Sequence, residues 1–482
     1  MVNIRVVARV LGILLTAEGI LMLITAAIAY AMGDYSAGSL FLSAIISITT
    51  GVFIYNPAKT EEELFGFREG YIILTGTWII FSLFGTLPFL LSGTVTSFTD
   101  AFFESVSGFT TTGATILTGL DSVPPGILLW RSLTQWMGGL GIIFLSMYIL
   151  PVFKDSPLQL STTEFSGQPA DKIHPRWMDT AIRLISIYII LTLAETLFLV
   201  AGNMSLFEAV CVSLSTLSTG GFSPRDNSLT LLATPYNKII VTLFMFVAGT
   251  NMTIFYFLLK GEFKRIREHS EFVFYLKLIT AAILITGGLL FMQDKFSFSE
   301  SILDSAFHVI SVTTTTGFYT NDFNQWGNFV IIIFFVLMFT GGTAGSASGG
   351  IKIARVMILA HNLRKELTRL IHPDAFLPVR LNHKIIPQGI VYNVMVFAVI
   401  YILVVSLCSL IISLMGYDII TSIGTAAAML GNIGPGIGEL GPMHNYASVA
   451  PAGKWFLSFV MILGRLELLA IMVLFARSFY RK

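Results

Sequence analysis

The sequence predicts an all-α integral membrane protein. Four repeats of span, pore helix, loop and span are expected around one pore, preceded by two extra transmembrane helices. Hydrophobic residues make up 54% of the 482 residues and charged residues only 12%, which is about half the charged fraction of an ordinary soluble chain. Apolar runs long enough to cross a bilayer recur along the whole chain. A short glycine-bearing loop also occurs four times between these runs.

The charge balance and the cysteines exclude several classes of protein. The formal net charge is +1, so the chain has no basic field for nucleic acid. Its two cysteines, Cys211 and Cys408, lie in apolar stretches without metal-ligand spacing, and we interpret them as small buried hydrophobes. No set of residues suggests covalent chemistry or a covalently bound cofactor. We therefore expect a protein that is not an enzyme.

Ten candidate spans follow from the apolar runs, because about 20 apolar residues cross a bilayer as a helix. In order they are 8–31, 38–55, 70–92, 125–150, 180–201, 236–260, 273–292, 327–360 (interrupted), 389–415 and 453–477. A cleaved signal peptide is the alternative for the first run, since Arg5 and Arg9 precede it. That run is longer than a usual signal core and a second apolar run follows at once, so we expect a retained span.

Four semi-apolar segments that are too short to cross the bilayer lie between the spans, at 100–112, 207–220, 303–316 and 420–431. Each is followed by one of the glycine-bearing loops. We therefore predict two extra N-terminal transmembrane helices at 1–56 and a first pore repeat at 69–151. Three further repeats follow at 177–261, 271–365 and 385–482, and the third of the four contains the interrupted helix.

The distribution of Lys and Arg predicts the orientation. With both termini in the cytosol, 23 of the 29 Lys and Arg residues fall on the inner side and 5 on the outer side, and Arg465 lies within the last span. All four glycine-bearing loops then lie on the outer side. A span that was omitted or wrongly included would assign every later segment to the opposite side and remove this bias. The bias therefore also supports the set of spans.

The register of the four loops can be read within the chain itself. After both Gly221 and Gly317 the next residue is Phe, and an Asp follows four residues later, so Gly221 rather than Gly220 corresponds to Gly317. The first three repeats carry an acidic residue thirteen positions before the loop glycine and a serine six positions before it. The acids are Asp100, Glu208 and Asp304, and the serines are Ser107, Ser215 and Ser311. The fourth repeat departs, with Thr421 and Ala428 at those places.

This spacing has a chemical interpretation. An acid at the start of a short helix complements the positive helix end, and the negative C-terminal end then favours a cation on the axis. Glycine suits the loop because carbonyls that all face one axis require backbone angles that other residues resist. Such a carbonyl ring replaces the hydration shell of an alkali cation. The candidate ligands are Thr111, Thr112 and Gly113; Thr219, Gly220 and Gly221; Thr315, Thr316 and Gly317; and Asn432, Ile433 and Gly434. One such loop alone would be an extramembrane turn, whereas four in one register favour a cation pathway.

A run of small residues, 340–350, interrupts the eighth span. It contains five glycines, Gly341, Gly342, Gly345, Gly349 and Gly350. Each interior glycine costs about 1 kcal/mol of helix stability relative to alanine, so the helix should open or bend here. A flexible gate and close helix packing through small residues are the two interpretations. A phosphate-binding loop is not expected, because the residues that follow are Ile351 and Lys352.

Arg465 is a charge in the middle of the last span, where a charge is costly and normally faces a cavity or a partner. One interpretation is an electrostatic barrier below the loops, which would repel resident cations. The other is an ion pair, for example with Glu195, the other deep charge. Elsewhere, the basic stretch from Lys260 to Arg267 is expected to contact either lipid head groups or a cytosolic partner.

With these motifs the chain resembles the Trk/Ktr/HKT superfamily of potassium transport proteins, over essentially its whole length. The two extra N-terminal spans make it most similar to the TrkH/TrkG branch of potassium uptake subunits. In that family a glycine in each loop marks potassium selectivity, so Gly113, Gly221, Gly317 and Gly434 imply K⁺ ions in a selectivity filter. The loop that contains Gly434 departs most from the others. The resemblance also implies that the glycine-rich run and Arg465 form a gate.

The resulting prediction is potassium uptake across the cytoplasmic membrane by a multi-pass protein embedded in membrane lipid. The resemblance further implies a homodimer and a cytosolic, nucleotide-binding regulatory ring of the TrkA type. A coupled symporter of potassium with sodium or protons is the first alternative, because such transporters use broken helices. Glu195 is its only deep acidic candidate in the repeats. A membrane scaffold or receptor without conduction is the second alternative.

Overall fold

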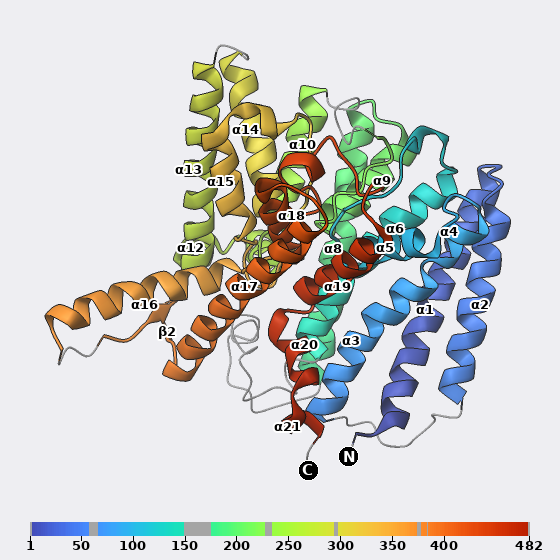
Figure 1. Cartoon of the computed structure of the whole chain (residues 1–482), viewed down its shortest axis with the longest axis horizontal. Helices are drawn as coiled ribbons and strands as arrows, with labels where there is room; N and C mark the ends of the chain where they lie inside the picture. Colours follow the sequence, from blue (N-terminus) through green and yellow to red (C-terminus); the bar gives the residue numbers. More distant parts are fainter. Residues whose placement is uncertain are drawn as a thin grey trace.

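The computed structural model describes residues 2–56, 66–148, 175–226, 234–293, 297–373, 377–382 and 384–480. These residues form a predominantly helical protein (Figure 1), so the predicted helical class is confirmed. The last residues of the predicted first and fourth repeats, 149–151 and 481–482, lie outside the described residues.

The two N-terminal helices pack closely as a pair at one side of the molecule (Figure 1). α1 (Ile4–Ala31) is capped by the side chain of Asn3, which accepts the backbone N–H of Val6. α2 (Ala37–Tyr55) returns beside it. A methyl group added to Gly12 would overlap the carbonyl oxygen of Gly51, and one added to Gly51 would overlap that of Gly12. The absence of side chains at these two positions therefore lets the backbones approach, as small residues do in membrane helix pairs.

We describe the rest of the chain as four consecutive segments. The first segment comprises α3 (Phe67–Phe84), α4 (Leu87–Leu91), the short α5 (Phe98–Phe109), η2 (Leu120–Ser122) and α6 (Pro125–Tyr148). The second comprises α8 (Pro175–Ala201), the short α9 (Leu206–Leu217), α10 (Pro235–Ala248) and α11 (Met252–Leu259).

The third segment comprises α12 (Phe263–Glu268), α13 (Ser270–Met292), α14 (Phe298–Thr313), η5 (Phe323–Trp326), α15 (Asn328–Met338) and α16 (Ile353–Ile371). A small antiparallel hairpin follows, formed by β1 (Arg380–Leu381) and β2 (Lys384–Ile385). The fourth segment comprises α17 (Gln388–Leu414), the short α18 (Ile419–Gly431), η6 (Gly438–Leu440), α19 (Pro451–Arg465), α20 (Leu468–Phe475) and α21 (Arg477–Tyr480).

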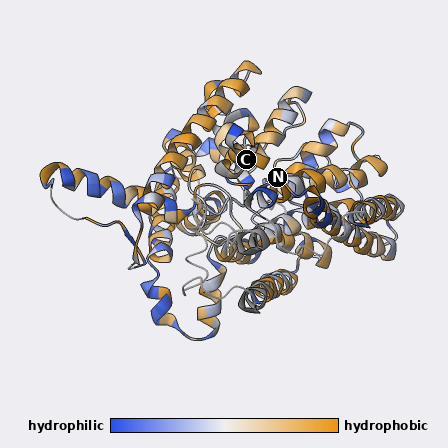
Figure 2. Ribbon diagram, turned by 90° about the horizontal axis from the view of Figure 1, so that it is seen from below, coloured by the Kyte–Doolittle hydropathy of each residue, from blue (hydrophilic) through white to orange (hydrophobic). Residues whose placement is uncertain are grey.

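Within the described residues, six stretches of helix are long and apolar enough to cross a membrane. They are Ile4–Ala31, Ala37–Tyr55, Arg68–Leu91, Ile182–Ala201, Ser270–Met292 and Gln388–Leu414, and the bent pair α10 and α11 makes a seventh if it is one span. The other predicted spans coincide with α6 and with two pairs of shorter helices, α15 with α16 and α19 with α20. The long apolar helices expose large apolar side chains, such as Leu197 of α8 at 71% and Leu414 of α17 at 87%. Figure 2 shows hydrophobic residues along the outer helices, as expected for contact with lipid.

Two spans that we predicted as continuous are broken. α10 and α11 meet at an angle of 106°, where the side chain of Asn251 accepts the N–H of Thr253 and caps a new helix. α19 ends at Arg465, and Glu467 adopts a positive φ of 55° before α20 begins. The eighth span is interrupted as predicted, between α15 and α16. The closing helices of the last three segments are thus all discontinuous.

Candidate functional site

The four short helices α5, α9, α14 and α18 end in the same backbone motif. A residue one or two positions after each helix adopts a left-handed conformation, with φ of 51° at Thr111, 55° at Thr219, 57° at Thr315 and 55° at Asn432. The next N–H donates to the carbonyl oxygen five residues earlier over 2.8–2.9 Å. The acceptors are Ser107, Ser215, Ser311 and Ala428. This is the Schellman arrangement, and all four loops therefore share one register.

Three of these left-handed positions are threonines, which is unusual. Glycine is the common residue there because it has no Cβ. A β-branched residue in this conformation costs about 1–3 kcal/mol and persists only where its surroundings determine it. Two positions later the backbone again adopts positive φ, this time at Gly113, Gly221, Gly317 and Gly434, with values between 76° and 94°. The loops thus hold a repeated strained backbone, as is frequent at functional sites.

The four loops meet in a closed ring. A methyl group added to each loop glycine would overlap a backbone carbonyl oxygen of the next loop. The pairs are Gly113 with Gly220, Gly221 with Thr316, Gly317 with Ile433, and Gly434 with Thr112. The order runs from the first loop to the second, third and fourth and returns to the first, so the loops surround one axis. These eight residues make the contacts between the loops, and the other four candidates, Thr111, Thr219, Thr315 and Asn432, are the left-handed residues of the same loops. We call the four loops, with these twelve residues, the carbonyl ring.

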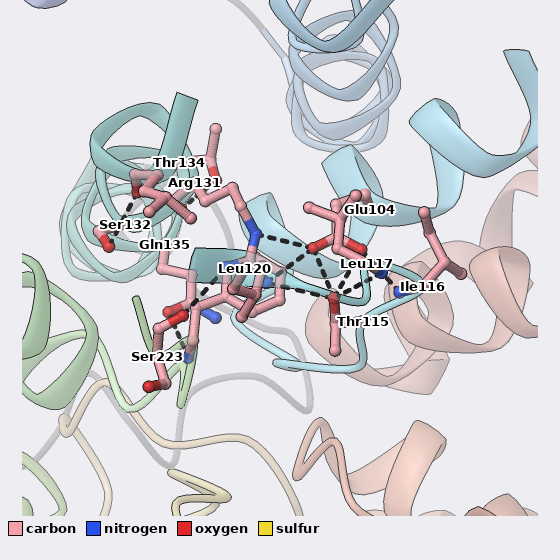
Figure 3. A network of polar contacts seen from close by, with 12 residues as sticks. Glu104, Thr115, Ile116, Leu117, Leu120, Arg131, Ser132, Thr134, Gln135 and Ser223 are labelled. Carbon is pink, nitrogen blue, oxygen red and sulfur yellow. Dashed lines mark hydrogen bonds and ion pairs between the residues drawn. The ribbon is translucent and has the colours of Figure 1, made fainter. Parts of the chain in front are cut away.

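A buried ion pair between Arg131 of α6 and Glu104 of α5 contacts both of the first two loops (Figure 3). Arg131 and Glu104 are 2.8 Å apart, and their side chains are 2% and 0% exposed. Glu104 also accepts the N–H of Ile116 in the first loop at 2.9 Å. Arg131 donates to the carbonyl oxygen of Ser223 at 3.1 Å, and its guanidinium lies 4.1 Å from the ring centre of Phe222 in the second loop. A buried pair with satisfied hydrogen bonds fixes geometry even where its net stabilisation is small.

Gln135 lies one turn after Arg131 on α6 and holds the second loop through both atoms of its amide. Nε2 donates to the carbonyl oxygen of Gly220 at 2.6 Å, and Oε1 accepts the N–H of Phe222 at 3.0 Å. The side chain therefore orients the peptide groups on both sides of Gly221. Sequence reasoning missed this role, because the partners lie 85 and 87 positions away in the chain and no local motif marks them.

The three acids predicted at the helix starts form ion pairs. Asp100 pairs with Lys454 of α19 at 2.6 Å, and Asp304 pairs with Lys238 of α10. Both pairs join neighbouring segments of the chain. Glu208 pairs with Arg225 at 2.6 Å, and Arg225 also pairs with Asp121 at 2.8 Å. Hydrogen bonds to Glu208 and Asp121 raise the pKa of the Arg225 guanidinium.

The helix starts themselves differ from our prediction. Asp100 and Glu208 do lie in the first turns of α5 and α9, but Asp304 lies inside α14, which begins at Phe298. A capping box between Ser297 and Glu300 starts that helix more than a turn earlier. The side-chain caps of α9, α14 and α18 come from Ser205, Ser297 and Asp418, which accept backbone N–H groups. The acids thirteen positions before the loop glycines are therefore partners of basic residues rather than helix caps.

The residues between α15 and α16, 340–352, lie beside the carbonyl ring, and we call them the glycine-rich segment. Its two ends approach each other, since the N–H of Gly341 donates to the carbonyl oxygen of Ile351 at 2.8 Å. The N–H of Gly349 donates to Oγ1 of Thr315, a left-handed residue of the third loop, at 2.7 Å. A methyl group on Gly349 would overlap the carbonyl oxygen of Gly431. The segment is therefore in direct contact with the third and fourth loops.

All five glycines of this segment have a visible structural role. Gly345 and Gly350 adopt φ of 78° and 65°. At the other three, Gly341, Gly342 and Gly349, an added methyl group would overlap backbone carbonyl oxygens. Of the two outcomes that we expected for this run, an opened or a bent helix, the structure has the opened one, a closely packed loop.

Arg465 holds the glycine-rich segment from α19. Its side chain is 2% exposed and donates to the carbonyl oxygens of Ala347 at 2.8 Å and of Gly138 in α6 at 3.1 Å. The ion pair with Glu195 that we considered is not formed, since Glu195 has no hydrogen-bond partner among the described residues. Glu467, two residues after Arg465, forms an ion pair with Arg355 of α16 at 2.5 Å. Arg465 is therefore a buried cation that binds two backbone carbonyls.

The donors available in the carbonyl ring suit a dehydrated monovalent cation. Among the residues that the structure describes, no group of three or more His, Cys, Asp or Glu could hold a metal ion. The loops instead contain backbone carbonyl oxygens where they meet, and each loop follows the C-terminal, negative end of a short helix. Each helix end carries roughly −0.5 elementary charge. Carbonyl rings of this kind coordinate alkali cations in place of water.

Comparisons by family model, by sequence and by structure all match the same group of proteins. The family model of the TrkH cation transport proteins matches residues 39–294 and 275–480. The chain is 34% identical to the Trk system potassium uptake protein TrkH of Salmonella typhimurium over 482 residues, which cover 99% of each chain. It is 33% identical to the corresponding protein of Halomonas elongata, with 100% of both chains covered. The crystal structure of the potassium transporter TrkH from Vibrio parahaemolyticus superposes with a TM-score of 0.91 at 31% identity, covering 99% of this chain and 100% of that one.

Proposed function

This chain belongs to the TrkH family of cation transport proteins, and from that membership we propose that it takes up potassium as the membrane subunit of a Trk system. The family resemblance inferred from the sequence is confirmed. The family consists of transport proteins, so the prediction that the chain is not an enzyme is also confirmed. The selectivity filter, the gate and the partners are our proposals.

The closed ring of loops is the observation that carries the proposal. A potassium ion that enters from the outer side would exchange its water for the carbonyl oxygens of the four loops. The loop glycines are essential to this geometry, because a Cβ at any of them would overlap the neighbouring loop. The negative ends of the four short helices would stabilise the ion without any carboxylate in its path. The residues proposed to form the filter are those of the carbonyl ring.

We propose that the glycine-rich segment and Arg465 close the path on the inner side of the ring. The segment is hydrogen-bonded to the third loop through Gly349 and to Arg465 through Ala347. A buried positive charge next to the axis would raise the energy of a cation there. Passage would therefore require movement of the segment, and the only covalent connections of the segment are to α15 and α16.

The regulatory partner and the oligomeric state are proposed from the family resemblance. The relatives are named as parts of a Trk system, which implies a membrane protein that works with other components. We propose a homodimer in the cytoplasmic membrane with both termini in the cytosol, regulated by a nucleotide-binding ring. The predicted excess of Lys and Arg on the inner side supports this orientation. The exposed basic helix α12, with Lys264, Arg265 and Arg267, would lie on that side.

Potassium uptake coupled to sodium or protons is the second candidate, and Glu195 is the observation that favours it. This carboxyl group lies in α8 and is 0% exposed, without a hydrogen-bond partner among the described residues. A buried ionisable group inside a membrane is costly and commonly functional. Coupling would make the rate of potassium uptake depend on a gradient of the second ion.

Cation flux in vesicles tests the proposed function. We expect vesicles that contain the purified protein to take up K⁺ down its electrochemical gradient, at a higher rate than Na⁺ and without a gradient of another ion. Vesicles without protein serve as the control. Uptake that requires a proton or sodium gradient, and that is lost in Glu195→Gln, would select the coupled mechanism. Absence of any cation flux from folded protein would contradict both and favour a scaffold.

A further inference from the structure

We propose that Glu271 is a positioning residue that fixes the resting place of the glycine-rich segment and links it to the cytosolic hairpin β1–β2. This inference rests on the proposed function, since it assigns a role in controlling the same path. The N-terminus of α16 lacks a capping side chain from its own N-cap residue. α16 begins after Lys352, whose side chain makes no capping bond and has no acceptor atom. The first N–H groups of a helix have no partner within the helix, and Ile353 and Ala354 are buried.

Glu271 supplies the missing acceptor from another helix. It lies in the first turn of α13 and is 0% exposed. Its Oε1 accepts the N–H of Ala354, in the first turn of α16, at 3.1 Å. The same oxygen accepts the N–H of Ala344, within the glycine-rich segment, at 2.7 Å. A carboxylate is favourable at the positive end of a helix, and hydrogen bonds to an ionised acceptor are stronger than neutral ones.

One carboxylate oxygen therefore ties the segment to the start of the helix that follows it. The neighbouring N–H, that of Thr343, donates to the carbonyl oxygen of Gly249 at the break between α10 and α11. This side of the segment is thus held by α13 and by the α10–α11 break. Arg465 holds the other side, at Ala347. A third attachment joins Gly349 to Thr315 of the third loop. A movement of the segment that opens the path would have to break one or more of these attachments.

The residue before Glu271 makes the connection to the cytosolic hairpin. Both the N–H and the Oγ of Ser270 donate to Oδ1 of Asn382 at 2.8 Å, and the N–H of Asn382 donates to Oγ of Ser270 at 3.1 Å. Asn382 lies at the turn between β1 and β2 with a φ of 47°. Adjacent residues of α13 therefore contact two places in the chain, the N-terminus of α16 through Glu271 and the later hairpin through Ser270.

The placement of α16 relative to the rest of the chain is seen in Figure 1. α16 projects from the body of the molecule, and the hairpin returns from its far end toward the base of α13. A force on the projecting part would act on the first turn of α13 at two adjacent contacts. Displacement of that turn would weaken the bonds from Glu271 and release the glycine-rich segment. We infer that the Ser270–Glu271 pair couples the cytosolic surface to the path for ions.

Substitution of Glu271 tests this role in purified full-length protein in vesicles. Glu271→Met keeps the length of the side chain and removes the acceptor. We expect K⁺ flux to rise about tenfold, the factor that corresponds to about 1.4 kcal/mol, with an unchanged preference for K⁺ over Na⁺. Glu271→Gln keeps an acceptor oxygen but loses the charge, so its flux should lie between that of Glu271→Met and that of the wild type. Glu18→Met is the matched control, because Glu18 is also 0% exposed but lies in α1, outside the four segments, and its flux should not change.

The outcomes separate this inference from the proposed function. Wild-type flux in both Glu271 variants, together with raised flux in Arg465→Ala, would overturn the role of Glu271 and leave the gate in place. Wild-type flux in all three would contradict the gate itself. A change in the K⁺ to Na⁺ ratio would also overturn the inference, because it would place Glu271 in ion selection. If Glu271→Met does not fold, Glu271→Gln decides the matter: raised flux supports the role and wild-type flux overturns it.

Discussion

Gly113→Ser is expected to lower the preference for K⁺ over Na⁺ by at least about tenfold, which corresponds to about 1.4 kcal/mol of lost discrimination. Gly113 adopts a φ of 80°, and a side chain there would overlap the carbonyl oxygen of Gly220. To relieve this overlap the first or second loop must move, which would change the positions of carbonyl oxygens in the proposed filter. The ratio of K⁺ to Na⁺ flux in vesicles measures the effect.

A matched control is available in the turn between α1 and α2. Gly33 has a similar φ of 71°, but an added Cβ would meet no atom within 4 Å. Gly33→Ser therefore introduces the same backbone strain without contact with the carbonyl ring, and its flux ratio should equal that of the wild type. An unaltered ratio in folded Gly113→Ser would argue against a filter formed by these loops. An equal loss in both variants would assign the effect to backbone strain in general.

Arg465→Ala is expected to raise cation flux several-fold, the second large effect. The substitution removes a buried positive charge beside the proposed path and both hydrogen bonds, to Ala347 and Gly138. The charge repels a passing cation, and the bonds hold the glycine-rich segment in place. Both losses act in the same direction. Initial rates of K⁺ uptake at equal protein content in the vesicles measure the change.

Arg465→Lys separates the two contributions. It keeps the positive charge, but a lysine ammonium cannot reproduce the planar, forked geometry of a guanidinium that bridges two carbonyls. Flux near that of the wild type in Arg465→Lys would show that the charge dominates, and flux near that of Arg465→Ala would show that the attachment dominates. Unchanged flux in Arg465→Ala, at normal expression, would contradict the role of this residue in the gate.

Local patterns in the sequence predicted the main architecture because the membrane restricts what a chain can do. Long apolar runs must form helices, since backbone groups in lipid need partners within the segment. The bounds of α1, α2, α13 and α17 accordingly follow the predicted runs closely. The glycines of the four loops were predictable for a related reason, as positive φ and close backbone contact both select glycine.

The features that could not be predicted depend on contacts that are distant in the chain. The roles of Gln135, Arg131 and Glu271 come from partners between 27 and 92 residues away. The break at Glu467 comes three residues after Gly464, but a single glycine does not by itself predict a break, and the pairing of Glu467 with Arg355 appears only in three dimensions. The start of α14 is a different case. Its capping box, Ser297 and Glu300, is a local sequence motif, but our prediction followed the register of Asp304 and placed the start of the helix too late.

The most direct measurement is a structure determined in the presence of rubidium, a heavier alkali ion that can stand in for potassium. If the four loops bind dehydrated cations, anomalous density will lie on the axis of the carbonyl ring, at the level of Gly113, Gly221, Gly317 and Gly434. A ring without rubidium density, or loops that stand apart and leave the axis open to water, would contradict the account.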